Sequence, residues 1–139
     1  SISSNAPTFA DITELTVDIT PASSSNKILV TAHINISSTS GYRTFHRFTR
    51  NNSALGVGST TVQSRTPATM STQGGGNQGQ MASMMFLDAP NSSSSQTYAV
   101  ESCTESTSGS VRINGELNDG NNSGQSRTIS TITVMEIAV

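Results

Sequence analysis

The sequence predicts an all-β fold, an antiparallel β-sandwich with a jelly-roll-like arrangement of about eight strands. Three observations lead to this prediction. Many short segments place apolar side chains at every second position, which is typical of half-buried strands. Turn-forming residues separate these segments at short intervals. Only 12% of the 139 residues are charged and Lys27 is the single lysine, so the chain lacks the residues that long surface helices require.

The first half of the chain contains four expected strands. Residues 15–20 and residues 28–36 place apolar side chains at alternate positions, which predicts a short strand followed by a long one. Residues 42–50 have β-forming side chains on both faces and predict a third strand. The sequence Asn-Asn-Ser at 51–53 predicts a hairpin turn, after which residues 55–62 return as the partner strand.

The chain is expected to form one domain over residues 1–139, with residues 1–12 as an N-terminal arm or linker. Residues 64–80 are rich in glycine and glutamine and show no periodicity, which predicts a long loop. Two glycines of the return strand, Gly56 and Gly58, indicate a bulge or a close approach of the backbone to another element.

The second half predicts strands over 81–88, 96–104, 110–114 and 128–139, with an irregular loop over 117–125. The first and last of these strands are apolar on both faces, whereas a solvent-exposed antiparallel strand keeps one polar face. A covering loop or a neighbouring subunit would bury the second face, and the sequence leaves both open. Our hypothesis is that the protein is a homo-oligomer in which another copy of the chain buries the second face. Its candidate interface residues are Met84, Met85, Ile129, Met135 and Ile137.

The composition argues against several classes of partner. The formal net charge is -2 and the seven basic residues form no extended stripe, so no nucleic-acid partner is expected. The longest apolar runs are too short to cross a membrane, and the N-terminal residues do not resemble a signal peptide. The single cysteine, Cys103, lies in an expected strand and has no intramolecular disulfide partner.

No motif for catalysis or metal binding stands out, and we expect no enzyme activity, no metal and no cofactor. The chain contains no G-x-S-x-G sequence. Its two histidines, His33 and His46, lie in expected strands without a second ligand at metal spacing. Residues 118–122 superficially resemble a calcium loop, but the terminal glutamate is missing.

One cluster of side chains suits a polar ligand such as a glycan. Aromatic rings stack on sugar faces, and guanidinium groups reach hydroxyls or acidic groups. The candidate residues lie in the third strand and the 117–125 loop: Tyr42, Arg43, His46, Arg47, Asn121 and Asn122. The alternative is a solvated strand face whose arginines pair with Glu101 or Glu105 across a sheet.

Several separated segments carry a family resemblance: residues 19–30, 48–58, 86–98, 111–114 and 127–138. They resemble the TPSSTSSKILV, LLRDGTEIGIG, YLDSPNTTSAVTYKV, VYIN and STITxMEI sequences of a C-terminal β-sandwich domain found in marine and environmental phage fibre, tail-fibre and decoration proteins. The last segment is the most specific. The hairpin differs, because Asn-Asn-Ser replaces the family's Asp-Gly turn, and residues 64–80 match least.

The resemblance implies a viral structural protein, either the head domain of a trimeric fibre or spike or a capsid decoration. The expected partners are further copies of the chain, other virion proteins and a host surface glycan. The expected location is the virion surface, after synthesis in the host cytoplasm without a signal peptide. No catalytic residue is implied. Two alternatives stay open, a carbohydrate-binding module without catalysis and a glycan hydrolase with two converging carboxylates.

Overall fold

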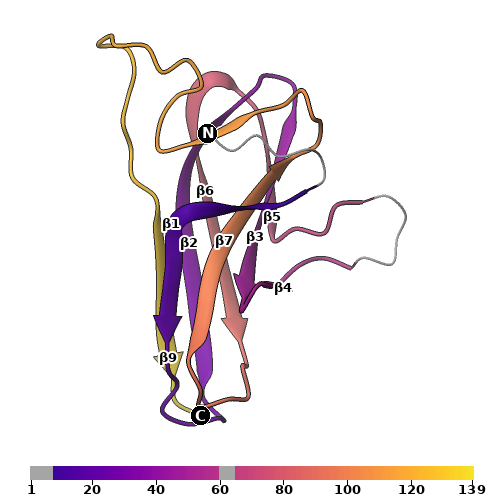
Figure 1. Ribbon diagram of the computed structural model, residues 1–139, viewed down its shortest axis with the longest axis vertical. Coiled ribbons are helices and arrows are strands. Elements are labelled where there is room, and N and C mark those ends of the chain that lie inside the picture. The colour runs from indigo at the N-terminus through magenta and orange to yellow at the C-terminus, as the bar shows by residue number, and fades with distance from the viewer. Residues whose placement is uncertain (1–7, 60–64) are drawn as a thin grey trace.

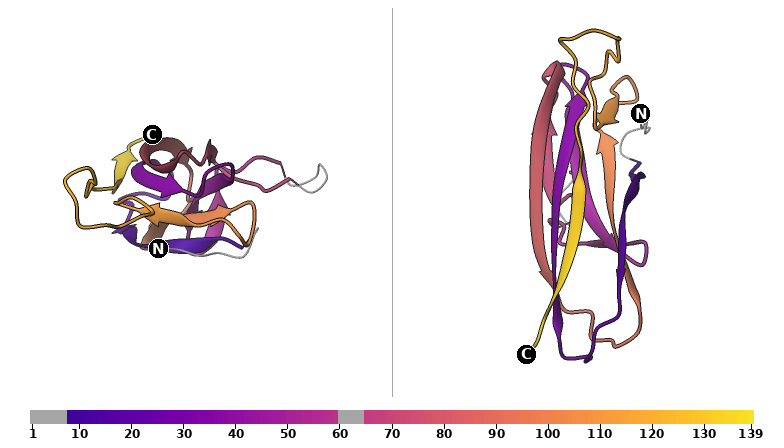
Figure 2. Two further views of the ribbon diagram at one scale, coloured as in Figure 1. Left: turned by 90° about the horizontal axis from the view of Figure 1, so that it is seen from above. Right: turned by 90° about the vertical axis from the view of Figure 1, so that its left-hand side faces the viewer.

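The computed structural model describes residues 8–59 and 65–139, and this part of the chain contains nine strands and no helix (Figure 1). The strands form two antiparallel sheets that pack face to face, which confirms the predicted β-sandwich (Figure 2). No helix that would span a membrane occurs among the described residues. The strands are β1 (Ala10–Ile19), β2 (Lys27–Ser38), β3 (Arg43–Arg50), β4 (Ser53–Leu55), β5 (Met70–Gln73), β6 (Gly76–Asp88), β7 (Gln96–Thr104), β8 (Val111–Ile113) and β9 (Thr131–Ile137).

One sheet has five strands in the order β1-β7-β3, with β4 and β5 both paired to the free side of β3. The other sheet has four strands, with β2 between β6 on one side and β8 and β9 on the other. The chain crosses between sheets from β1 to β2, β2 to β3, β5 to β6, β6 to β7 and β7 to β8. This repeated crossing is the connectivity expected of a jelly-roll-like sandwich.

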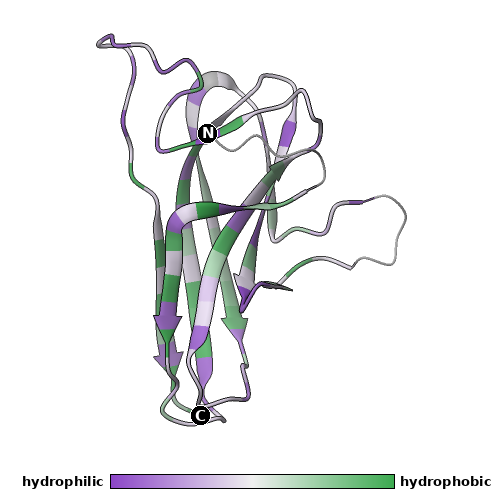
Figure 3. Ribbon diagram, viewed as in Figure 1, coloured by the Kyte–Doolittle hydropathy of each residue, from purple (hydrophilic) through white to green (hydrophobic). Residues whose placement is uncertain are grey.

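The core lies between the two sheets and is built on the alternation predicted for β2. Its inward side chains, which are at most 1% exposed, are Ile28, Val30, Ala32, Ile34 and Ile36. Phe48, Tyr98 and Val100 of the five-stranded sheet pack against them and are fully buried. Figure 3 shows the resulting alternation of apolar and polar residues along the strands. The core is therefore mainly aliphatic, with Phe48 and Tyr98 as its fully buried aromatic residues.

The hairpin predicted at residues 51–53 joins β3 to β4. Asn51 and Asn52 have φ angles of 48° and 64°, and Arg50 pairs with Ser53. Two central residues with positive φ define the type I′ turn that matches strand twist in a two-residue hairpin. Asparagine tolerates this conformation better than most residues, which explains the Asn-Asn sequence.

Two predicted boundaries are wrong. Strand β1 begins at Ala10, so the expected arm over 1–12 overlaps a strand, and its residues 1–7 lie outside the described part of the chain. The predicted return strand over 55–62 ends at Leu55 as β4. Its residues 60–62 also lie outside the described part.

The predicted loop over 64–80 is wrong over most of its length, and its residue 64 lies outside the described part. Strand β5 pairs with β3, and β6 begins at Gly76, opposite Ser38 of β2. The side chains here are polar or absent and give no hydrophobic periodicity. Buried side chains fix the positions of β2 and β3, and backbone hydrogen bonds to these two strands hold β5 and the start of β6 in an extended conformation. Strand formation depends on such neighbouring strands as well as on the local sequence.

Gly56 makes the close approach that the sequence indicated. Its φ is +61°, and a Cβ atom on it would lie 2.6 Å from Cδ2 of Phe86. We expect Gly56→Ala to lower the free energy of unfolding by about 2 kcal/mol, through backbone strain and overpacking. Chemical denaturation measures this loss. Gly58→Ala is the matched control, because a Cβ there meets nothing within 4 Å. Equal stabilities of the two variants would contradict this account.

Candidate functional site

The basic residues predicted to bind a ligand lie on the outer face of the five-stranded sheet. Arg47 faces Glu101 of β7 across the ladder, with 2.6 Å between Nε and Oε2, and its guanidinium lies 3.9 Å from the centre of the Phe9 ring. Arg43 pairs with Glu105 at 3.1 Å. The backbone N–H of Arg43 also donates to Glu105, and this bond first, then the guanidinium, holds the pKa of that carboxyl below its usual value. The arginines therefore pair with Glu101 and Glu105 as in the alternative that the sequence offered, although only Arg43 is well exposed and the Arg47–Glu101 pair is largely buried.

His46 points the other way and is fully buried, so its place in the predicted ligand site is wrong. Alternation along β3 turns Arg43 and Arg47 outward and His46 inward. Both ring nitrogens have partners: Nδ1 lies 2.7 Å from Oγ of Ser102, and Nε2 lies 3.1 Å from Oγ1 of Thr44. Burial lowers the pKa of His46 to about 4.

His46 makes the stability of the fold sensitive to mild acid. The unfolded chain binds a proton near pH 6.5, whereas the folded chain resists protonation until about pH 4. The contribution of the neutral His46 ring to the free energy of unfolding is fully present above pH 6.5. About 3 kcal/mol of this contribution is lost as the pH falls from 6.5 to 4. Denaturation at a series of pH values measures this slope. His46→Gln should flatten it within that window, and parallel profiles for the two proteins would contradict the assignment.

Asn121 and Asn122 are exposed in the loop between β8 and β9, which projects from one end of the sandwich (Figure 1). They line an open polar pocket of about 320 Å³ whose described lining includes no residue of β3. Asp119 anchors this loop through ion pairs with Arg112 and Arg127. The structure therefore does not bring the two asparagines together with the predicted residues of β3. Tyr42 lies half-buried in the turn before β3.

The outer face of the four-stranded sheet exposes several large apolar side chains among polar ones such as Thr31, His33 and Ser83. The strand register places Leu87, Leu29 and Met135 in one row across β6, β2 and β9. We call this surface the apolar sheet face. Its large exposed side chains, between 37% and 68% exposed, are Met81, Met85, Leu87, Met135 and Ile137. Figure 2 shows the three strands in one layer of the sandwich, with β1 and β7 in the opposite layer.

The apolar sheet face contains three of the five predicted interface residues: Met85, Met135 and Ile137. Met84 is only 5% exposed and packs in the core, because its neighbour Met85 takes the outward position, so its assignment to an interface is wrong. Ile129 is 77% exposed but precedes β9, which is shorter than the predicted strand over 128–139.

Glu136, the acidic residue on the inner face of β9, stabilises the turn between β1 and β2. Oε1 of Glu136 lies 2.7 Å from both Nδ2 of Asn26 and the backbone N of Ala22, which donate to it. The Asn26 amide and then the Ala22 N–H hold the pKa of this carboxyl below its usual value. Glu136 therefore fixes the turn between β1 and β2, and the outward residues of β9 stay free of acidic groups.

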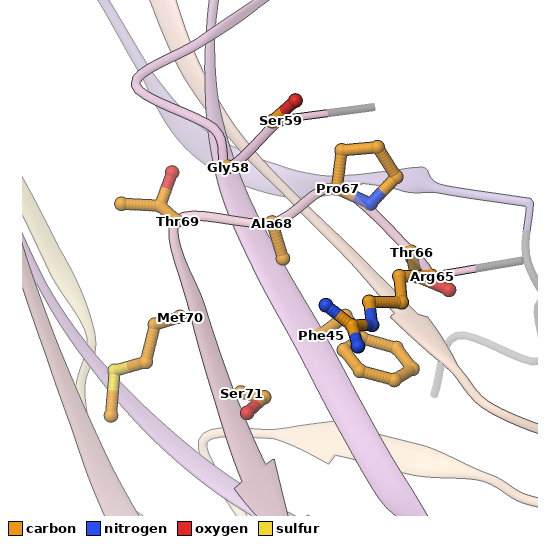
Figure 4. Close-up of a pocket in the computed structure, with 10 residues that line it drawn as sticks. All are labelled: Phe45, Gly58, Ser59, Arg65, Thr66, Pro67, Ala68, Thr69, Met70 and Ser71. Carbon is orange, nitrogen blue, oxygen red and sulfur yellow. The ribbon is translucent and has the colours of Figure 1, made fainter. Parts of the chain in front are cut away.

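A second pocket, of about 440 Å³, lies between the outer side of β3 and β5 and the segments that flank residues 60–64 (Figure 4). Its lining comprises Phe45, Gly58, Ser59, Arg65, Thr66, Pro67, Ala68, Thr69, Met70 and Ser71. Sequence reasoning missed this pocket, because it expected a featureless loop here. One signal was present: no Asp or Glu occurs between Asp18 and Asp88, so Arg65 has no acidic neighbour in the sequence.

Among the described residues, no group of three or more His, Cys, Asp or Glu side chains could hold a metal ion. Cys103 is a buried residue of β7, as its sequence context predicted, and burial raises the pKa of its thiol to about 11. A thiol that stays protonated at neutral pH is a poor nucleophile.

The described residues form a small antiparallel β-sandwich with an apolar sheet face, a pocket at Phe45 and Arg65 and a pocket in the loop between β8 and β9. A scan against protein-family models finds no family that matches the chain, and a search of curated proteins finds no matching relative. The resemblance to phage fibre domains stays a prediction from the segments that carry it.

Proposed function

We propose that the protein is a structural component of a virus particle, the head domain of a homotrimeric fibre or spike or a capsid decoration. The apolar sheet face carries this proposal, because it offers a surface on which identical subunits can assemble. The sequence resemblance supplies the viral setting and the trimer. The proposed location is the virion surface, in contact with other virion proteins and with the host.

The apolar sheet face has the chemistry of a subunit interface. Contiguous apolar patches on soluble proteins mark interaction sites, and burial contributes about 1.5–3 kcal/mol for each large apolar side chain that is fully covered. The outward residues of β2, β6 and β9 that pair in the register include no carboxylate, and Lys27 is the only Lys or Arg among them. A second copy therefore meets this surface with little repulsion between like charges.

The remaining surface differs from this face. Three carboxylates, Glu101, Glu105 and Asp119, form ion pairs with arginines, and most outward positions of the five-stranded sheet are polar. Five of the seven large exposed hydrophobic side chains of the described residues therefore lie on the apolar sheet face, and the other two, Ile129 and Val139, flank β9. Concentration on one layer supports assembly through that layer.

The mass of the protein in solution tests the proposal. Light scattering behind size exclusion should give three times the 14.5-kDa chain mass at micromolar concentration. A folded monomer that persists at high concentration would contradict it. A dimer would retain the apolar interface and reject the trimer.

Glycan binding without catalysis is the second candidate function, and the pocket at Phe45 and Arg65 favours it. The described lining of this pocket holds no carboxylate and no histidine, so it offers no acid–base pair for glycoside hydrolysis. The hydrolase alternative gains no support from this pocket.

A further inference from the structure

The pocket at Phe45 combines an aromatic surface with a cation. Phe45 lies on the outward side of β3, with Ser71 of β5 and Cys103 of β7 opposite it in the ladders. Arg65 belongs to the segment that returns toward β5. Figure 4 shows the Arg65 side chain and the Phe45 ring on the same side of the pocket, whereas Met70 points away from both.

Arg65 differs from the other arginines in its charge balance. Arg43, Arg47, Arg50, Arg112 and Arg127 each pair with a carboxylate. Arg65 forms no ion pair with any described residue, and the described lining of the pocket contains no Asp or Glu. The pocket therefore carries a positive charge that no described side chain balances, and its own chemistry favours an anion.

The other lining groups restrict which anion fits. The guanidinium of Arg65 alone would be enough to bind a small inorganic anion. The ring of Phe45 adds C–H and stacking contacts, which favour a ligand with a flat, partly apolar face. Hydroxyl groups of Thr66 and Ser71 also line the pocket and can donate or accept hydrogen bonds, whereas the Thr69 hydroxyl already accepts from Phe48 N and donates to Leu55 O. A volume of about 440 Å³ lies within the range of small-molecule sites.

We propose that this pocket binds a sugar unit that bears a carboxylate. The sugar ring stacks on Phe45, its hydroxyls bond to the pocket hydroxyls, and its carboxylate pairs with the planar guanidinium of Arg65. This site differs from the one that the sequence indicated at Arg43 and Arg47, whose charges are already paired. The inference does not rest on the virion assignment or on the oligomer.

Glucuronic acid and glucose are matched probes, because they differ only in the carboxylate at C6. Titration of the ¹⁵N-labelled protein, followed by NMR, should show saturable shifts at Ala68, Thr69 and Ser71 with glucuronate. Glucose should bind at least about tenfold more weakly, since one charge-assisted hydrogen-bonded pair accounts for such a factor. Absence of shifts at these amides would overturn the proposal.

Arg65→Ala should weaken glucuronate binding at least about tenfold and remove the preference over glucose. Arg43→Ala is the matched control, because it removes an exposed arginine from the same sheet face and should leave the affinity within about twofold. Phe45→Leu should weaken binding of both sugars, which tests the stacking contact. Equal affinity for inorganic sulfate and glucuronate, or an unchanged affinity in Arg65→Ala, would overturn the proposal. Neither outcome depends on the oligomeric mass.

Discussion

Replacing Asp88 by alanine is expected to lower the free energy of unfolding by about 3–5 kcal/mol, because it breaks a buried charge pair. Asp88 is the last residue of β6 and is only 5% exposed. Its Oδ2 atom lies 2.7 Å from the hydroxyl oxygen of Tyr98 and 2.6 Å from Nη1 of Arg50, both in the opposite sheet. One carboxylate therefore joins the two layers of the sandwich.

Removal of Asp88 would leave two buried or half-buried groups without a partner. The fully buried Tyr98 hydroxyl would lose its acceptor, and Arg50 would lose its counter-charge. Burial, followed by the bond to Asp88, already raises the pKa of Tyr98 well above its ordinary value. An unsatisfied buried polar group costs about 1–3 kcal/mol by itself, which is why the loss should exceed that of an ordinary ion pair.

Chemical denaturation at one fixed protein concentration measures this effect, since association adds to the apparent stability. Asp88→Asn keeps an oxygen that accepts from Tyr98 and should cost less than Asp88→Ala. Glu105→Ala removes an exposed pair and should cost no more than about 1 kcal/mol. If Asp88→Ala and Glu105→Ala lowered the free energy of unfolding by the same small amount, the bonds of Asp88 to the opposite sheet would not contribute to stability as proposed.

The sequence was most informative where one strand has a clear apolar face. In β2 every second residue from Ile28 to Ile36 is apolar, and all of these side chains are buried. The hairpin at Asn51 and Asn52 was equally predictable, because a local conformational requirement selects those residues. The conformations of core strands and tight turns depend on residues that are close together in the sequence, so a single sequence is enough to predict them.

Strand β3 was harder to orient, because both of its faces carry β-forming polar residues. Thr44 and His46 point inward, where Thr72 of β5 and Ser102 of β7 supply hydrogen-bond partners. Those partners lie 28 and 56 residues further along the chain. The inward face of β3 therefore depends on contacts that periodicity within β3 does not encode, and this is why His46 was assigned to a ligand site.

The pocket at Phe45 and Arg65 could not be predicted from the sequence for the same reason. Phe45 and Arg65 come together only because β5 pairs with β3, and β5 itself lacks hydrophobic alternation. The apolar sheet face, in contrast, was foreseen as a property of two strands with apolar residues on both sides. The sequence did not say which methionine faced outward, because a shift of one residue reverses the faces of a strand.

Replacing Met85 by lysine is expected to weaken self-association by at least about 100-fold, which corresponds to roughly 3 kcal/mol for an uncompensated charge at an interface. Met85 is 68% exposed on β6, opposite Thr31 of β2, so the folded monomer tolerates the new side chain. Lys27, the only Lys or Arg among the outward residues of β2, β6 and β9, adds repulsion instead of a partner.

Thr16→Lys is the matched control for this charge. Thr16 is exposed on β1, in the opposite sheet, beside acidic residues Glu14 and Asp18 in the same strand. Light scattering should return one chain mass for Met85→Lys and the full assembly mass for Thr16→Lys, with both variants folded by circular dichroism. An assembly that survived Met85→Lys would place the subunit contact elsewhere, because a lysine at the centre of a dry interface loses its hydration without gaining a counter-charge. Dissociation by both variants would point to general destabilisation rather than to the apolar sheet face.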